Sequence, residues 1–115
     1  MINHIKNIKD IVMSSPEVKE AKMKALVGPE EGWDGYVMRL VEVGPYGYTP
    51  KHQHPWPHIN YMVEGDGEVF LDGEVYPVTE GSFAYIEVNK LHQFKNTTNK
   101  TFKFICIVPK EGHIV

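Results

Sequence analysis

Residues 47–65 read GYTPKHQHPWPHINYMVEG, and this stretch decides the fold. It places three of the six histidines of the chain, at positions 52, 54 and 58, close together. In an extended strand, residues two apart project from one face, so His52 and His54 can converge on one ion. Prolines on both sides of Trp56 fix φ and bend the chain, so that His58 can enter the same space from the next strand. The stretch therefore predicts a metal site built between short strands.

The composition of the chain fits one small domain of 115 residues. A single cysteine excludes an internal disulfide framework and is typical of a reducing compartment, so we expect a cytoplasmic protein. No stretch has the roughly 18–20 apolar residues of a membrane span, and the N-terminus lacks an apolar signal segment. The net charge of −3 comes without a basic block, so neither nucleic acid nor a membrane is expected as a partner.

Short apolar runs separated by glycine and proline extend on both sides of the histidine stretch, as in an all-β fold. Alternation of apolar and charged residues predicts a strand with one wet face over 21–27. Asp72-Gly73 is a strong two-residue hairpin signal between strands at 68–71 and 75–78. The remaining expected strands cover 36–43, 49–54, 58–64, 82–88, 91–95 and 101–108. This pattern predicts an antiparallel sandwich or barrel.

Two short segments predict where a strand ends and where a helical turn begins. Gly44-Pro45-Tyr46-Gly47 should end the strand over 36–43, because proline removes a backbone donor. Ser15-Pro16-Glu17 resembles a helix start, with a capping serine followed by proline at the first helical position, so we expect a short helical turn there.

Two spacings between residues 47 and 96 resemble the paired motifs of the cupins. The first consists of Gly47, four residues, His52-Gln53-His54, three residues, His58, six residues and Gly65. The second consists of Gly81, five residues, Glu87-Val88-Asn89, two residues, His92, three residues and Asn96. This resemblance implies an all-β double-stranded β-helix, the jelly-roll barrel of a small single-domain cupin. That domain would cover 1–115, with an N-terminal arm at 1–20 and site motifs at 47–67 and 81–96.

The chain departs from the cupin pattern at three places. The first glycine gap is one residue short, which alters only the turn. Glu87 and Asn89 replace a proline and a glycine, and the turn should survive because asparagine tolerates the left-handed conformation. His58 stands where most cupins carry a glutamate ligand, a variant found in similar small monocupins. The resemblance thus implies one divalent metal ion per chain, with His52, His54, His58 and His92 as ligands.

Replacing the carboxylate ligand by imidazole leaves the full charge of the divalent ion uncompensated. The metal is then a stronger Lewis acid that attracts anionic ligands, and the site loses a carboxylate base. In the cupin geometry, four protein ligands leave open positions on the metal, which is typical of a catalytic or ligand-binding site. We expect manganese or iron in the cell, while nickel, zinc or copper can occupy such a site after isolation, because affinity rises towards copper.

Strand parity predicts the pocket beside the ion. The candidate functional residues beyond the metal ligands are Arg39, Asn60, Phe104 and Cys106. Asn60 and Met62 share the face of His58, and Phe104 and Cys106 point inward if Lys103 faces water. Asn60 either supports the ligands or bonds to backbone, and Cys106 is more typical of a small core hydrophobe than of a nucleophile.

Arg39 shares a face with three valines, so it should point inward. It is either an anchor for a carboxylate or phenolate of the substrate, an arginine paired to a buried acid, or an arginine that reaches back to the rim.

An open metal site in an apolar pocket favours a metal-dependent, oxygenase-like oxidoreductase that acts on a small aromatic or unsaturated acid or a phenol. The alternative is a sensor cupin that binds a small molecule without turnover. A sugar isomerase or epimerase ranks last, because it needs a pocket base. A barrel of this size exposes strand edges and small cupins commonly dimerise, so we also expect a homodimer, with 21–27 as a strand that could cross over.

Overall fold

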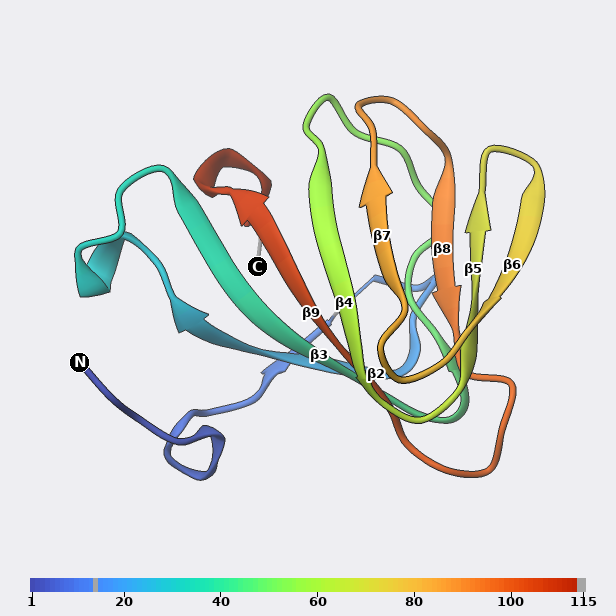
Figure 1. Ribbon diagram of the computed structural model, residues 1–115, viewed down its shortest axis with the longest axis horizontal. Coiled ribbons are helices and arrows are strands. Elements are labelled where there is room, and N and C mark those ends of the chain that lie inside the picture. The colour runs from blue at the N-terminus through green and yellow to red at the C-terminus, as the bar shows by residue number, and fades with distance from the viewer. Residues whose placement is uncertain (14, 114–115) are drawn as a thin grey trace.

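The computed structural model describes residues 1–13 and 15–113, and these form a curled antiparallel sheet (Figure 1). Within the described residues, the nine strands in chain order are β1 (Ile11–Val12), β2 (Lys19–Val27), β3 (Tyr36–Tyr48), β4 (His58–Glu64), β5 (Gly67–Leu71), β6 (Glu74–Val78), β7 (Phe83–Ile86), β8 (His92–Lys95) and β9 (Phe102–Pro109). The short 3-10 helices are η1 (Ile5–Asn7), η2 (Pro29–Glu31) and η3 (Lys110–Gly112). The prediction of an all-β barrel is confirmed.

The strands follow the order β6-β5-β8-β3-β9-β4-β7, with β2 paired to β3 and β1 paired to β2. Strand β3 therefore lies at the centre of the path and joins the two halves of the curled sheet. In Figure 1 it runs from the side that carries β2 towards the base of β8. No helix in the described part of the chain has the length and apolarity that a membrane crossing requires.

The core lies on the inner face of the curled sheet, with buried side chains from β2, β3, β4, β5, β7, β8 and β9. The strand β9 alternates as expected, with Phe104 and Cys106 buried and Lys103 on the opposite face. Cross-strand registry places Cys106 opposite both Arg39 of β3 and Asn60 of β4. The side chains of these three neighbours therefore share one face, and this row leads from the middle of the sheet to the site described below.

The hairpin expected at Asp72-Gly73 is confirmed. Leu71 pairs with Glu74, and the two turn residues have φ values of 50° and 93°. Two positive φ values in a two-residue loop match the right-handed twist of the flanking strands.

The expected end of the strand at Gly44-Pro45 is wrong, because β3 continues to Tyr48. Up to Val43 the strand pairs with β9, whereas at Tyr48 it pairs with Lys95 of β8. The intervening Tyr46 has a φ of 56°, and the register against β2 shifts in this region. Glycine and proline thus mark the bend at which β3 changes partners, as at a β-bulge.

The helical turn expected at Ser15-Pro16-Glu17 is also wrong. The N–H of Val18 donates to the carbonyl of Ser15 at 3.2 Å, and the hydroxyl of Ser15 accepts from the N–H of Glu17 at 3.2 Å. The capping serine therefore closes a single turn, after which the chain enters β2.

Candidate metal centre

Four histidines meet at one end of the curled sheet. His52 and His54 lie in the loop between β3 and β4, while His58 begins β4 and His92 begins β8. An isolated β-bridge joins His52 to His92, with N–H···O distances of 3.1 and 2.9 Å. The expected strand over 49–54 is therefore wrong, because this bridge is the extent of its strand pairing. The prolines of the loop lack the donors that a continuous ladder needs.

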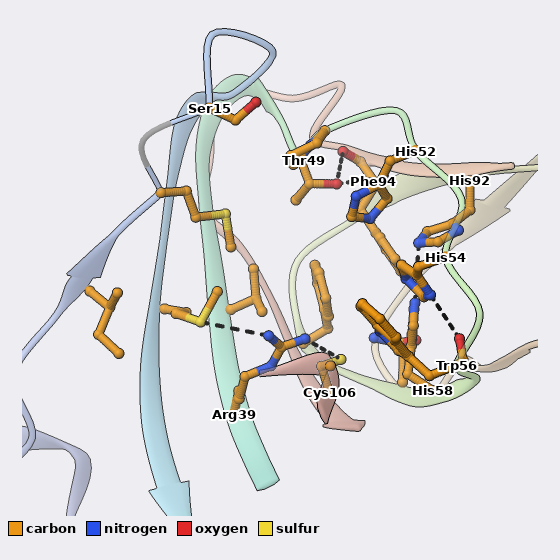
Figure 2. A pocket seen from close by; sticks show the side chains of 18 of the residues that line it. Ser15, Arg39, Thr49, His52, His54, Trp56, His58, His92, Phe94 and Cys106 are labelled. Carbon is orange, nitrogen blue, oxygen red and sulfur yellow. Dashed lines mark hydrogen bonds between the residues drawn. The ribbon is translucent and has the colours of Figure 1, made fainter. Parts of the chain in front are cut away.

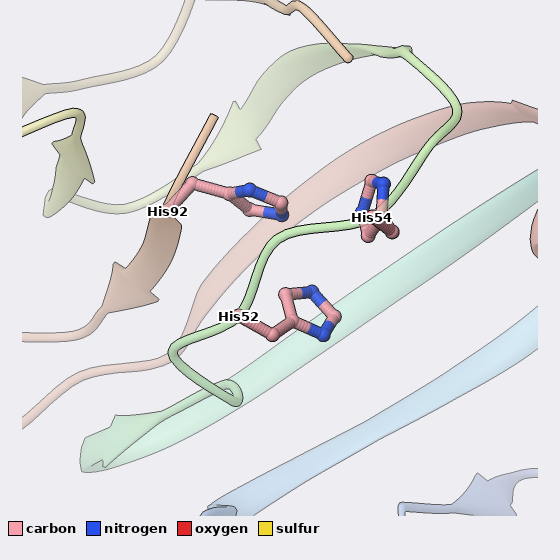
Figure 3. Close-up of side chains that lie close together, drawn as sticks. All are labelled: His52, His54 and His92. Carbon is pink, nitrogen blue, oxygen red and sulfur yellow. The ribbon is translucent and has the colours of Figure 1, made fainter. Parts of the chain in front are cut away.

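The imidazoles of His52, His54 and His92 form a compact cluster (Figure 3). Each ring offers one nitrogen, and the three nitrogens lie within 4.8 Å of one another. His58 adjoins this cluster, since its Nε2 lies 3.1 Å from Nε2 of His92 and its ring centroid lies 5.2 Å from that of His54. The arrangement is compatible with a single metal ion.

Hydrogen bonds at Nδ1 fix the tautomers of two of these rings. Nδ1 of His54 lies 2.7 Å from the carbonyl oxygen of Trp56, and Nδ1 of His92 lies 2.8 Å from that of Lys90. A carbonyl oxygen only accepts, so each Nδ1 carries the proton and each Nε2 carries a lone pair.

A side chain holds His58 in the same way. Its Nδ1 donates to Oδ1 of Asn60 at 2.6 Å, and both residues are buried. The Nε2 atoms of His58 and His92 then face each other with a lone pair on each, and neither can donate to the other. A cation satisfies both lone pairs, so the donor set fits a divalent ion bound by neutral imidazoles whose outer nitrogens are held by acceptors.

Burial keeps these imidazoles neutral. It lowers the pKa of His58 to about 3 and that of His52 to about 4, and the positive charge of Arg39 adds a smaller effect in the same direction. The pKa values of His54 and His92 are lowered as well, again mainly by burial. Neutral imidazole is the form that binds metal, so the ligands need not lose protons at neutral pH.

A cavity of about 590 Å³ opens beside the histidines (Figure 2). The four residues expected to line a pocket all lie on its wall: Arg39, Asn60, Phe104 and Cys106. Residues 11–13 of the N-terminal arm complete the wall. They were not predicted, because the strand there has only two residues and is too short to show an alternating pattern in the sequence. Among the described lining residues none is aspartate or glutamate, and most of the wall is apolar. The volume and lining are typical of a small-molecule site.

Arg39 reaches this cavity from β3 without an acidic partner. Its terminal nitrogens lie 3.2 Å from Sγ of Cys106 and 4.0 Å from Sδ of Met23, and sulfur is a weak acceptor. Its Nε is buried and has no hydrogen-bond partner among the described residues. The salt bridges found in that part of the chain all involve lysine. The alternative of an arginine paired to a buried acid is therefore wrong.

Two stacked aromatic pairs flank the cavity. Trp56 lies flat on His54, with ring centroids 4.7 Å apart and planes inclined by 9°, and it packs against Gly112 of η3. Phe94 stacks on Phe104, with centroids 4.3 Å apart and planes inclined by 20°. Phe94 was not among the expected pocket residues, although its place two residues after His92 puts both on one face of β8.

With this geometry established, comparison with known proteins identifies the family. The cupin domain profile matches residues 39–108, which include all four histidines and most of the cavity wall. The chain belongs to the cupin family. The jelly-roll barrel implied by the sequence resemblance is thus the fold of this cupin.

Relatives of this cupin include polyketide enzymes. It is 30% identical over 95 residues to "Polyketide synthase CurC" of Streptomyces cyaneus, covering 76% of this chain and 59% of that protein. It therefore spans about three fifths of the length of this curated relative. The structure of the polyketide cyclase RemF from Streptomyces resistomycificus is 29% identical, with a TM-score of 0.88 and coverage of 95% of this chain and 78% of that one.

A cupin 2 domain-containing protein from Halorhodospira halophila is 36% identical, with a TM-score of 0.73 and coverage of 77% of this chain and 63% of that one.

Proposed function

We propose that this cupin is a metal-dependent enzyme in which His52, His54, His58 and His92 bind one divalent ion. Its substrate is a small aromatic or unsaturated acid or a phenol held in the adjacent cavity. One observation carries the proposal: neutral imidazoles with fixed tautomers turn their unprotonated nitrogens towards one another beside a largely apolar cavity.

The donor set limits the chemistry of the site. A divalent ion held by neutral imidazoles supplies a Lewis acid that keeps its full positive charge. Manganese or iron is our proposal for the ion in the cell. Asn60 holds His58 by accepting from Nδ1, and Trp56 holds His54 both by stacking and through its carbonyl. Because the described lining contains no carboxylate, proton abstraction of the kind that sugar isomerisation needs is not favoured.

Two reactions suit such a site. Ring closure of an enolisable, polyketide-like substrate is supported by the two Streptomyces relatives, one named a polyketide synthase and the other a polyketide cyclase. Oxygenase-like oxidation is supported by the largely apolar wall of the cavity and by its volume of about 590 Å³. We place ring closure first, because polarising a carbonyl needs no redox change, and a proton between two carbonyls that the metal would polarise is acidic enough to pass to water without a carboxylate base.

Metal substitution separates these reactions. The protein would be loaded with zinc, manganese or iron and given phenolic and enolic acids, with and without dioxygen. Products formed with zinc in the absence of dioxygen would support ring closure, and oxygen uptake with iron or manganese alone would support the oxygenase. Tight binding without product would favour the sensor alternative. His92→Ala is the matched control, and stoichiometric metal retention by this variant would contradict the proposed site.

A further inference from the structure

We propose that Arg39 makes the cavity selective for organic acids, with a carboxylate at the terminal guanidinium nitrogens and the rest of the ligand extending towards the histidines. This inference rests on the proposed function, whose substrate class it narrows. It assigns a specificity-determining role to a residue outside the metal ligands.

The positive charge of Arg39 is not compensated by a side chain among the described residues. Arg39 contacts two sulfur atoms, and its Nε has no partner among the described residues. A guanidinium offers five N–H donors and stays protonated in proteins. Holding such a cation away from water without an anion is unfavourable, whereas a carboxylate offers paired acceptors that match its fork. A ligand anion would supply the negative charge and the hydrogen-bond acceptors that no described side chain offers to Arg39.

The nearest acid on the same strand is occupied elsewhere. Glu42 is the closest acid along β3, but it lies three positions after Arg39 and therefore on the opposite face of the strand. Its carboxylate binds Lys22 at 3.1 Å and Lys103 at 3.4 Å. Among the described residues that line the cavity, Arg39 is therefore the sole fixed charge, and nothing on the wall competes with a ligand for it.

Arg39 belongs to a row of cross-strand neighbours that leads to the histidines. Arg39 is the cross-strand neighbour of Cys106, which in turn is the neighbour of Asn60, the residue that holds His58. Arg39 and the four histidines all line the cavity, and in the view of Figure 2 the arginine lies at the bottom and the histidines lie to its right. A ligand that fills the space between them therefore has an anionic end and a metal-facing end. The stacked aromatic pairs on the wall favour a flat molecule between these ends.

The experiment compares 4-hydroxybenzoate with its neutral amide, 4-hydroxybenzamide, at constant ionic strength. Binding is measured by calorimetry on metal-free and on zinc-loaded protein. For the wild type we expect the acid to bind about ten- to hundredfold more tightly than the amide. Arg39→Gln should bring this ratio close to one while leaving zinc stoichiometry unchanged.

Lys103→Gln is the matched control, because it also removes one positive charge but from the outer face of β9, and it should keep the ratio. Equal affinities of the wild type for acid and amide, no binding of either at millimolar concentration, or a ratio that survives in Arg39→Gln would overturn the proposal. If the protein retains no metal at all, the proposed function fails, yet the ratio on metal-free protein still decides the role of Arg39.

A urea titration of Arg39→Met separates this role from a structural one. Replacing an unpaired, partly buried charge by an apolar side chain should leave the midpoint unchanged or raise it. A lowered midpoint together with a retained acid preference in Arg39→Gln would show that the arginine only stabilises the fold.

Discussion

At the scale of single residues, Asn60 determines how His58 presents its Nε2. The buried amide accepts from Nδ1 at 2.6 Å and so excludes the tautomer that would place a proton on Nε2. We expect Asn60→Ala to weaken zinc binding by about ten- to hundredfold, as is usual when such a partner is lost. A competition titration against a chromophoric chelator measures this. Asn60→Asp keeps an acceptor at the same place and should retain most of the affinity, so equal losses in the two variants would contradict the argument.

The low pKa of His58 also predicts how stability responds to acid. Its pKa is about 3 in the folded protein, whereas 6.5 is the ordinary value expected for the unfolded chain. Between these values the unfolded chain binds more protons, so the contribution of His58 to stability is complete above pH 6.5 and is lost as the pH falls towards 3. For His58 alone the slope approaches about 1.4 kcal/mol per pH unit.

Urea unfolding of the metal-free protein at several pH values between 7 and 4 measures this slope. His58→Gln should show a shallower one, because it lacks the titrating group. A stability that is flat or rises on acidification over this range would be inconsistent with burial of the neutral ring.

At the scale of elements, the turn between β7 and β8 aligns the second histidine segment with the first. Asn89 has a φ of 59°, and its N–H donates to the carbonyl of His54 at 2.8 Å. Asn89→Ala places an unfavourable left-handed alanine at this position and should lower the free energy of unfolding by roughly 1–2 kcal/mol. Asn89→Gly adopts the same conformation at little energetic cost, so the two variants should differ in urea midpoint. Equal midpoints would show that the backbone conformation is not what the asparagine provides.

Elements set by local chemistry could be predicted from the sequence. The turn at Asp72-Gly73 needs two positive φ values, which these residues tolerate, and Asn89 adopts the left-handed conformation expected of it. The inward positions of Phe104 and Cys106 follow from the period of two in a strand. The histidine spacing belongs to this class, because the motif lies within one loop and one strand start.

Elements set by distant pairing could not be predicted. Pro45 indicates a strand end locally, yet β3 passes it because β8 and β2 pair with the chain beyond it. His52 forms only a bridge, and its partner His92 lies forty residues away, so local signals do not show how far this pairing extends. The alternation of side chains along the strand predicted that Arg39 points into the barrel. Whether an acidic side chain contacts it could not be predicted, because that depends on the residues that β2 and β9 bring to the cavity.

At the scale of the whole molecule, the outer face of β4 and β7 carries an uncharged patch formed by Ile59, Tyr61, Phe83 and Tyr85. These side chains are 51–78% exposed, and they lie in two directly opposed cross-strand pairs. We propose that a second copy of this chain covers the patch, because a face without charge does not repel its own copy. Strand β2 pairs with β3 of the same chain, so the proposed contact does not need it to cross over.

Sedimentation at micromolar concentration tests this proposal, with a dimer expected for the wild type. Tyr85→Lys introduces a charge on both sides of the symmetric contact and should give a monomer. Val75→Lys on β6 changes a similarly exposed residue outside the patch and should leave the dimer intact. A monomeric wild type, or a dimer that persists in Tyr85→Lys, would exclude this surface.

The carbonyl and amide oxygens that occupy Nδ1 of three histidines have a calorimetric consequence. In most metal sites ligand protons pass to the buffer during loading, and the measured heat depends on which buffer receives them. Here the rings are already neutral at pH 7, and the protons on Nδ1 point away from the cluster. Zinc titrations in PIPES and in HEPES, two buffers that bind zinc weakly, should therefore give the same heat, although the two buffers differ in ionisation enthalpy. A difference equivalent to one proton per ion would mean that a ring enters the reaction charged; equal heats would make this a site that takes up its metal without acidifying its surroundings.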